Sequence, residues 1–168
     1  IAGAAGPKVT CLAGTIHFEE RNLLGLNSRA LRKVRGGPVA MVPGVSGAPL
    51  NPDRTVRQWL RDFSRMAGRG RGLREEKTWD DYFYRVGILE PERVLGQLPG
   101  DLSPLTVKRL LVMRAIMAGA RLLICDEPGA DLDPITRKQF LKLLRLTRDE
   151  TGMGILLSSG SLRGVEVC

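Results

Sequence analysis

The chain has 168 residues, of which 43% are hydrophobic and 26% charged, a balance that is typical of one soluble globular domain and not of a disordered chain. No apolar run approaches the roughly 20 residues of a membrane-spanning helix, and no charged segment precedes an apolar core at the start, so we expect no signal peptide. The formal net charge of +8 favours acidic partners such as nucleotides, nucleic acid or anionic lipid headgroups, and a solvated basic surface explains it equally well.

The cysteines and the histidine do not indicate a metal centre. Cys11, Cys125 and Cys168 are widely spaced, and His17 is the single histidine. No metal-ligand spacing results, so we expect no zinc site, and a reducing compartment is the simplest interpretation. We expect Cys125, within an apolar run, to be a packed core thiol.

The first elements in chain order alternate between strand and helix. Residues 14–20 predict a strand and 27–37 a short helix that Asn27 or Ser28 caps. Residues 38–42 predict a second apolar strand. The breaker-rich segment over 43–52 predicts a loop.

From Asp53 the pattern becomes helical. One face of the first helix is apolar, and the opposite face carries four arginines; the apolar residues are Val56, Trp59, Leu60, Phe63 and Ala67, and the arginines are Arg54, Arg57, Arg61 and Arg65. Glycines over 68–72 end this helix, and a second helix follows to Gly87. We therefore predict an arginine-rich helical insert over 53–101 between two strand-bearing parts, 1–52 and 102–168. The arginine face is either a solvated surface or a docking surface for an acidic partner.

The last part of the chain predicts a strand–helix–strand unit. It begins with a helix that Ser103 caps, with Pro104 at its first position, and this helix is apolar nearly all round, so we expect it to be buried. An apolar strand over 121–126, an amphipathic helix over 134–152 and an apolar strand over 154–159 follow. This order predicts a parallel sheet with strands covered on both faces.

Two adjacent acids, Asp126 and Glu127, end the strand over 121–126, and Asp131 and Asp133 lie in the turn that follows. Paired carboxylates beyond a buried strand are typical of sites that meet a metal, a water or a phosphate. The alternative is a strand-end pair that caps the loop toward Asp131.

Several separated motifs resemble the ATP-binding cassette (ABC) transporter ATPases. "LLICDEP" resembles a Walker B strand with its glutamate, and "ADLD" resembles the D-loop. The stretch over 14–42 is similar to the oligopeptide, dipeptide and nickel importer ATPases, as are "LNP" at 50–52, "RVGILEPERVL" at 85–95 and "ETGMGILL" at 150–157. The resemblance covers nearly the whole chain from Pro7. It implies an α/β fold with a P-loop NTPase-like, RecA-like parallel sheet, here incomplete, and an inserted α-helical subdomain.

The resemblance also implies roles for single residues. Asp126 would hold magnesium through water, and Glu127 would polarise the attacking water. Ser103, in the signature position, and Asp133, in the D-loop, would belong to a composite site shared with a second cassette. ATP and Mg²⁺ are the implied cofactors, a permease and a second cassette the implied partners, and the cytoplasmic face of the cell membrane the implied location.

This sequence departs from the family where the chemistry takes place. No Gly-Lys-Ser/Thr phosphate loop occurs in the 168 residues; "GAAGPKVT" at 3–10 is only superficially similar. The Q-loop glutamine falls on Gly44 and the switch histidine on Gly160. The signature falls on "LSPLT", in which Pro104 lacks an N–H and Leu105 places an isobutyl group where a phosphate would meet bare backbone.

Three functions are consistent with these residues. We favour a degenerate or truncated cassette subunit that acts as a partner or scaffold for a permease or second cassette. The second is an active transport ATPase whose remaining parts lie outside this chain. The third is a basic nucleic-acid-binding module on the same scaffold, and we do not expect nucleic acid to be the partner.

Overall fold

The computed structural model describes residues 13–35, 37–45, 50–66 and 78–160. Its helices and strands follow the predicted alternation and are, in chain order, β1 (His17–Phe18), β2 (Arg21–Asn22), α1 (Ser28–Val34), β3 (Val39–Val42), α2 (Val56–Met66), α3 (Trp79–Arg85), α4 (Pro91–Leu95), α5 (Pro104–Ala118), β4 (Leu122–Asp126), α6 (Pro134–Thr151) and β5 (Gly154–Ser158). Short 3-10 turns over Leu23–Gly25 and Pro99–Asp101 complete them.

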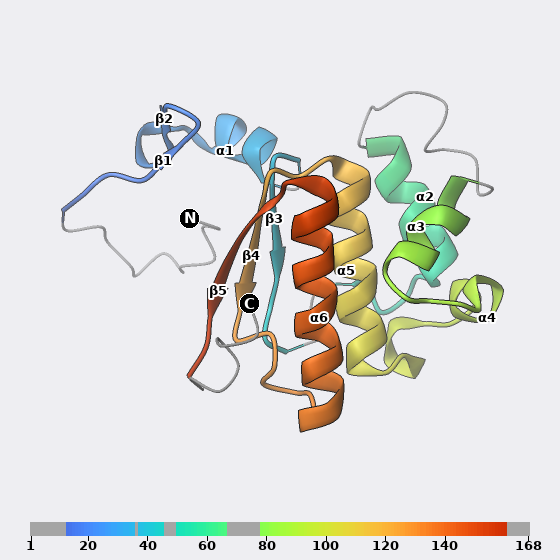
Figure 1. Cartoon of the computed structure of the whole chain (residues 1–168). Helices are drawn as coiled ribbons and strands as arrows, with labels where there is room; N and C mark the ends of the chain where they lie inside the picture. Colours follow the sequence, from blue (N-terminus) through green and yellow to red (C-terminus); the bar gives the residue numbers. More distant parts are fainter. Residues whose placement is uncertain (1–12, 36, 46–49, 67–77, 161–168) are drawn as a thin grey trace.

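The central sheet has three strands in the order β3-β4-β5, and both pairings are parallel. The parallel sheet and the β4–α6–β5 unit are therefore confirmed. Because the strands run the same way, their carboxyl ends lie at one edge, where Val42 pairs with Cys125 and Asp126 pairs with Ser158. Figure 1 shows that the first turns of α5 and α6 lie at this same end of the molecule.

Helices α5 and α6 cover one face of the sheet (Figure 1). The main hydrophobic core includes side chains of these helices and of the sheet strands. Leu123 and Cys125 of β4 are fully buried in it, which confirms Cys125 as a core residue. The hydrophobic side chains of α5 are buried on nearly every side, as its composition predicts. Gly119 ends α5 and Gly152 ends α6, each in the left-handed conformation that glycine adopts without a steric cost.

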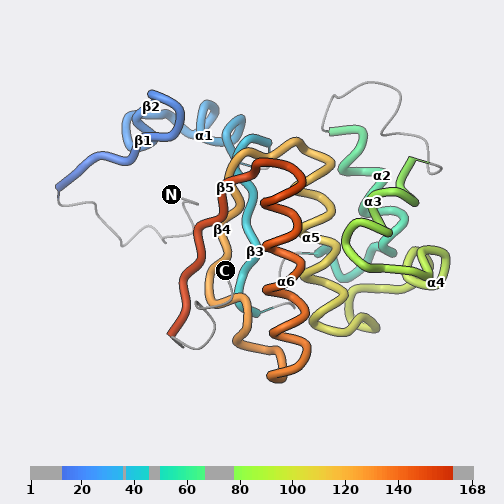
Figure 2. The backbone as a smooth tube through the Cα atoms, viewed as in Figure 1, coloured from blue at the N-terminus to red at the C-terminus, as the bar shows by residue number. Residues whose placement is uncertain are grey.

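Residues 16–34 form a small unit that packs on the other face of the sheet. Figure 2 follows the chain from the β1–β2 hairpin into α1. Leu122 and Ile124 of β4 pack against the small buried cluster of Leu23, Val34 and Val39 and are themselves half-buried, so the second face of this strand is partly covered. The single strand predicted over 14–20 is wrong in extent, because the chain reverses at Glu19 and Glu20, which both have positive φ, and returns as β2.

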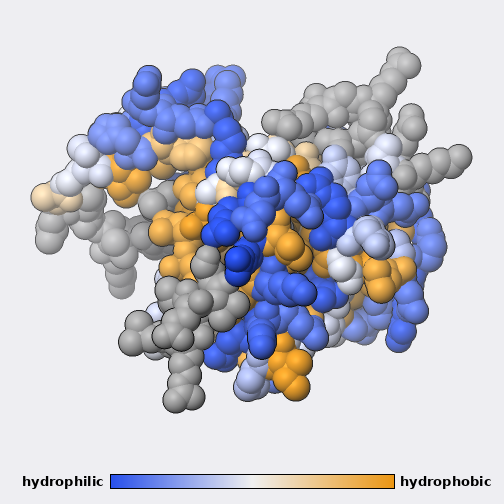
Figure 3. Space-filling view, in the orientation of Figure 1, coloured by the Kyte–Doolittle hydropathy of each residue, from blue (hydrophilic) through white to orange (hydrophobic). Residues whose placement is uncertain are grey.

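Strand β5 is less covered than its apolar sequence predicts. Its side chains alternate between exposed and half-buried, and Leu156 is 46% exposed. Within the described residues β5 pairs only with β4, so it is the edge of the sheet. Figure 3 shows hydrophobic surface on this side of the molecule.

Helices α2, α3 and α4 form a further layer beyond α5 (Figure 1), in the region predicted as a helical insert. Trp79 and Phe83 of α3 are fully buried in the shared core, and Trp59 of α2 packs at its margin. The domain boundaries at 52 and 101 stay a prediction. No described helix combines the length and the apolar character that a membrane span requires.

The predicted arginine face of the first helix differs from the structure. Arg54 precedes α2 instead of lying on it. Arg57 does not simply face solvent, because its Nη2 lies 2.7 Å from Oε2 of Glu92 on α4. Arg65 pairs with Asp62 one turn earlier, at 3.3 Å. Ala67 and the glycines over 68–72 lie outside the described residues.

Candidate functional site

The two adjacent acids lie at the carboxyl end of β4 and are held there by β5. Ser158 Oγ donates to Asp126 Oδ1 at 2.6 Å, and Glu127 N donates to Ser158 Oγ at 3.0 Å and to Ser158 O at 3.2 Å. Glu127 has φ 45°, a conformation that is unusual for a residue with a side chain. We call Asp126 and Glu127 the acid turn. Both acids hydrogen-bond to Ser158, and the Glu127 carbonyl also accepts from Ala130 N at 2.9 Å within the loop. The alternative in which the acids cap the loop toward Asp131 stays a prediction.

Two glycines lie against the acid turn. A Cβ atom at position 44 would lie 3.0 Å from the carbonyl oxygens of both Asp126 and Glu127. A Cβ atom at position 160 would lie 3.3 Å from Glu127 Oε1. The positions that match the family's Q-loop glutamine and switch histidine are thus beside Glu127, and neither brings a side chain to it.

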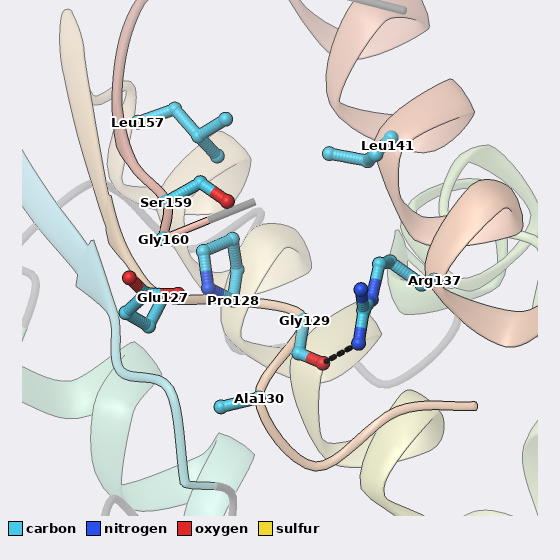
Figure 4. Close-up of a pocket in the computed structure, with 9 residues that line it drawn as sticks. All are labelled: Glu127, Pro128, Gly129, Ala130, Arg137, Leu141, Leu157, Ser159 and Gly160. Atoms are coloured by element: carbon cyan, nitrogen blue, oxygen red, sulfur yellow. Dashed lines mark hydrogen bonds between the residues drawn. The ribbon is translucent and has the colours of Figure 1, made fainter. Parts of the chain in front are cut away.

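A small cavity of about 180 Å³ opens beside Glu127. Figure 4 shows Glu127, Ser159 and Gly160 at one side of it and Arg137 of α6 at another. Arg137 Nη2 donates to the carbonyls of Gly129 at 3.0 Å and Leu132 at 3.4 Å. Arg137 therefore holds the loop between β4 and α6 in place from the side of α6.

Ser103 and Asp133 cap the two helices that start at this end of the molecule. Ser103 Oγ accepts from Thr106 N at 3.2 Å and contacts Thr106 Oγ1 at 2.8 Å, as predicted for the N-cap of α5. Asp133 Oδ1 accepts from the N–H groups of Ile135 and Thr136 at 2.9 and 3.1 Å, at the start of α6. The hydrogen bond from the Thr136 hydroxyl is the largest cause that lowers the pKa of Asp133, and the backbone N–H groups add to it.

Sequence reasoning missed Lys108, which lies beneath the site. Its side chain is fully buried, and its Nζ donates to Gly44 O at 2.7 Å and to Pro43 O at 3.2 Å. It also forms an ion pair with Asp131 Oδ1 at 2.8 Å. The sequence carried a signal, since Lys108 is a charged residue in the middle of a helix whose composition predicts burial on all sides.

The acid turn suits a magnesium ion that is shared with a nucleotide. Mg²⁺ is usually held through one or two carboxylates together with substrate phosphates. Among the residues that the structure describes, no cluster of three or more His, Cys, Asp or Glu side chains could hold a metal on its own. Phosphates need N–H groups or cations, but Arg137, the cation that lines the cavity, donates to backbone carbonyls. Of the two acids only Glu127 lines this cavity, so its lining offers one carboxylate to a metal and no uncommitted cation to a phosphate.

Comparison with known proteins shows which sequences and folds this chain resembles. No protein-family model matches the sequence. The chain is 33% identical over 159 residues to the uncharacterized ABC transporter ATP-binding protein YejF of Escherichia coli (strain K12). It is 32% identical over 166 residues to the probable peptide ABC transporter ATP-binding protein y4tR of Sinorhizobium fredii (strain NBRC 101917 / NGR234). These curated relatives, which match more than nine-tenths of this chain, are ABC transporter ATP-binding proteins.

Solved structures agree on the fold of this cassette chain. It superposes on cbiO1 from Clostridium perfringens, part of the ABC transporter complex cbiONQ, with a TM-score of 0.77 at 23% identity, covering 99% of this chain and 62% of that one. For the ATP-binding cassette MJ0796, a dimer bound to ADP and Pi, the TM-score is 0.74 at 18% identity, covering 93% and 66%. The predicted P-loop NTPase-like fold is confirmed.

The chain spans about a third to a half of the length of these curated relatives. The YejF match covers 93% of it and 30% of YejF, and the y4tR match covers 96% of it and 49% of y4tR. The predicted recognition as an ABC transporter ATP-binding protein is confirmed, whereas the roles of Ser103, Asp126, Glu127 and Asp133 stay predictions.

Proposed function

We propose that this chain is the ATP-binding component of a peptide- or nickel-type ABC importer, that it is impaired in ATP hydrolysis, and that it serves as a partner or scaffold for a permease or a second cassette on the inner face of the cell membrane. The observation that carries the proposal is the pair of glycines against Glu127. The carboxylate that would polarise water is retained, but the two positions beside it, Gly44 and Gly160, offer no group to orient that water or to contact a phosphate.

The peptide class rests on the names of relatives. Besides y4tR, the putative peptide import ATP-binding protein BAB2_1052 of Brucella abortus (strain 2308) is 30% identical over 151 residues, covering 90% of this chain and 46% of that protein. Bound ATP and Mg²⁺ would supply the phosphoryl chemistry. Asp126 would hold the metal through water, Glu127 would face the attacking water, and Ser103 and Asp133 would face the second cassette.

A second candidate function is an active ATPase that is completed by residues outside this chain. It is favoured by the ordered geometry of the acid turn, since Ser158 fixes both Asp126 and Glu127 by short hydrogen bonds. A pair of acids without any function would not need to be held in a strained backbone conformation.

Nucleotide binding and turnover separate these candidates. We expect calorimetry with Mg-ATP to show binding weaker than micromolar, and we expect any slow ATP hydrolysis by the purified protein to be unchanged by Glu127→Gln. Micromolar binding together with hydrolysis that Glu127→Gln abolishes would replace the first function with the second.

The partner surface is proposed to lie on the helical layer. Arg54 and Arg61 are exposed there, and Arg32, Lys33, Arg35 and Arg114 line a hollow of about 520 Å³ beside Trp59 and Phe63. Such a mixture of cations and aromatic rings suits an acidic segment of a permease.

Arg54→Glu with Arg61→Glu should weaken capture of the membrane partner, whereas Lys138→Glu with Lys142→Glu on exposed positions of α6 should not. Equal capture by both variants would show that the arginine face is solvated surface and not a docking surface. Salt-dependent binding to DNA would favour the nucleic-acid alternative instead.

A further inference from the structure

Lys108 is the only charged side chain that is fully buried among the described residues. It projects from the second turn of α5, the helix that Ser103 caps. An ammonium group has three N–H donors, and the structure provides three acceptors within 3.2 Å: the carbonyls of Pro43 and Gly44 and the carboxylate of Asp131. The two carbonyls accept hydrogen bonds from the buried ammonium group, and the Asp131 carboxylate forms an ion pair with it at 2.8 Å.

The three acceptors belong to two loops that are far apart in the sequence. Pro43 and Gly44 follow β3, and Asp131 lies in the loop between β4 and α6. The second loop begins at the acid turn, and the first touches it, since a Cβ atom at position 44 would lie 3.0 Å from the carbonyl oxygens of Asp126 and Glu127. Lys108 thus joins the two loops that flank Glu127.

Burial makes this junction strong. A charged group out of water is stable only when it is paired and hydrogen-bonded, so displacement of either loop would remove part of the pairing of the buried ammonium group: its two carbonyl acceptors in one case and its counter-charge in the other. A rotation of either loop away from Lys108 is therefore opposed by the desolvation of the cation as well as by the loss of the contact itself. The loops should open together or not at all.

We propose that Lys108 is a positioning residue that ties the Gly44 loop to the Asp131 loop and thereby fixes Glu127 within the site. Lys108 does not touch the cavity beside Glu127, and it acts through the backbone of Gly44 and the carboxylate of Asp131. The importance of this tie for ATP chemistry rests on the proposed function, whereas the tie itself does not.

Amide hydrogen exchange of the full-length protein tests the tie without any requirement for turnover. Lys108→Met keeps most of the length of the unbranched side chain and removes the ammonium group. We expect exchange to accelerate at least about tenfold in both segments, 44–45 and 127–132, with the amides in the middle of α6 unchanged. Lys142→Met, at an exposed position of α6, is the matched control and should leave both segments as they are.

Substitution of Asp131 provides a second test of the tie, which applies if Lys108→Met does not fold. Its side chain is 23% exposed, so substitution there is milder. Asp131→Asn should accelerate exchange in segment 44–45, on the far side of Lys108, and Asp131→Glu, which keeps the carboxylate, should restore protection. Acceleration near residue 131 alone, a uniform rise over the whole domain, or equal behaviour of Asn and Glu would overturn the proposal. A protein that shows the coupled exchange, binds Mg-ATP with micromolar affinity and hydrolyses it would refute the proposed impairment and leave the tie intact.

Discussion

Gly160 lies directly against the carboxylate of Glu127: a Cβ atom at position 160 would be 3.3 Å from Glu127 Oε1. The residues that follow β5 therefore lie beside Glu127, the acid that follows β4. In this cassette the delivered residue has no side chain, which leaves the carboxylate facing the cavity. An introduced side chain at position 160 would have Glu127 as its first polar neighbour.

Gly160→His should produce an imidazole with a raised pKa. A nearby carboxylate favours the protonated form, so the pKa of the introduced histidine should exceed the ordinary value of about 6.5. NMR titration of the imidazole protons measures this pKa. The same substitution in a Glu127→Gln background is the control, in which the pKa of the introduced histidine should fall back. Identical titration in the two backgrounds would show that the two side chains do not meet.

Gly44→Ala should destabilise the fold, because the new methyl group would lie 3.0 Å from two backbone carbonyl oxygens that cannot move independently of the acid turn. Overpacking of this kind costs about 1–3 kcal/mol, and Gly44→Gln should cost at least as much. Urea denaturation measures the free energy of unfolding.

Gly96→Ala is the matched control for that substitution. No atom lies within 4 Å of the Cβ position at residue 96, and its φ of −80° suits alanine. The change should stay within about 0.5 kcal/mol of zero. If Gly44→Ala behaves like Gly96→Ala, the Gly44 loop is free to withdraw and the site is not tightly packed.

The stability of α6 should depend on pH through Asp133. Hydrogen bonds from Thr136 and Ile135 lower the pKa of this carboxyl in the folded state. A lowered folded pKa means that the stabilisation is present above the unfolded pKa, which is about 3.9, and disappears as the pH falls through the folded pKa. The difference in unfolding free energy between the wild type and Asp133→Asn should therefore be largest near neutral pH and shrink in acid.

Thr136→Val tests the cause of that pH dependence. The Thr136 hydroxyl is the largest contributor to the lowered pKa of Asp133, and valine has nearly the same shape without the donor. Chemical denaturation at several pH values should show a shallower acid dependence in this variant. An unchanged slope would assign the lowered pKa to the backbone N–H groups alone.

The ion pair between Arg57 and Glu92 should hold α2 against α4. Arg57 Nη2 and Glu92 Oε2 are 2.7 Å apart, but the glutamate side chain is 83% exposed. Exposed pairs contribute about 0.2–1 kcal/mol. Arg57→Glu should therefore destabilise modestly through repulsion, and addition of Glu92→Arg should restore most of the loss in a double-mutant cycle. Additive effects of the two substitutions would mean that the pair does not contribute in solution.

Local patterns were sufficient to predict most helices and strands. Ser103 caps α5 and Gly152 ends α6 as predicted, because capping depends on residues within a few positions of one another. The hairpin between β1 and β2 was missed, because its turn consists of Glu19 and Glu20 in place of the glycine or asparagine that signals such a turn.

The sequence by itself determined the identity of the acids at the end of β4, the helix caps and the resemblance to ABC proteins, since each is encoded in neighbouring residues. Only the tertiary structure decided what lies around Glu127. Gly44, Lys108 and the segment from Ser158 to Gly160 are far from Glu127 in the sequence, and they meet it or its loop where the parallel strands bring their carboxyl ends to one edge of the sheet and α5 begins. The sign of a charge can be read from the sequence. Whether that charge is solvated or buried depends on which distant carbonyls and carboxylates the fold places next to it. Lys108 is the example in this chain.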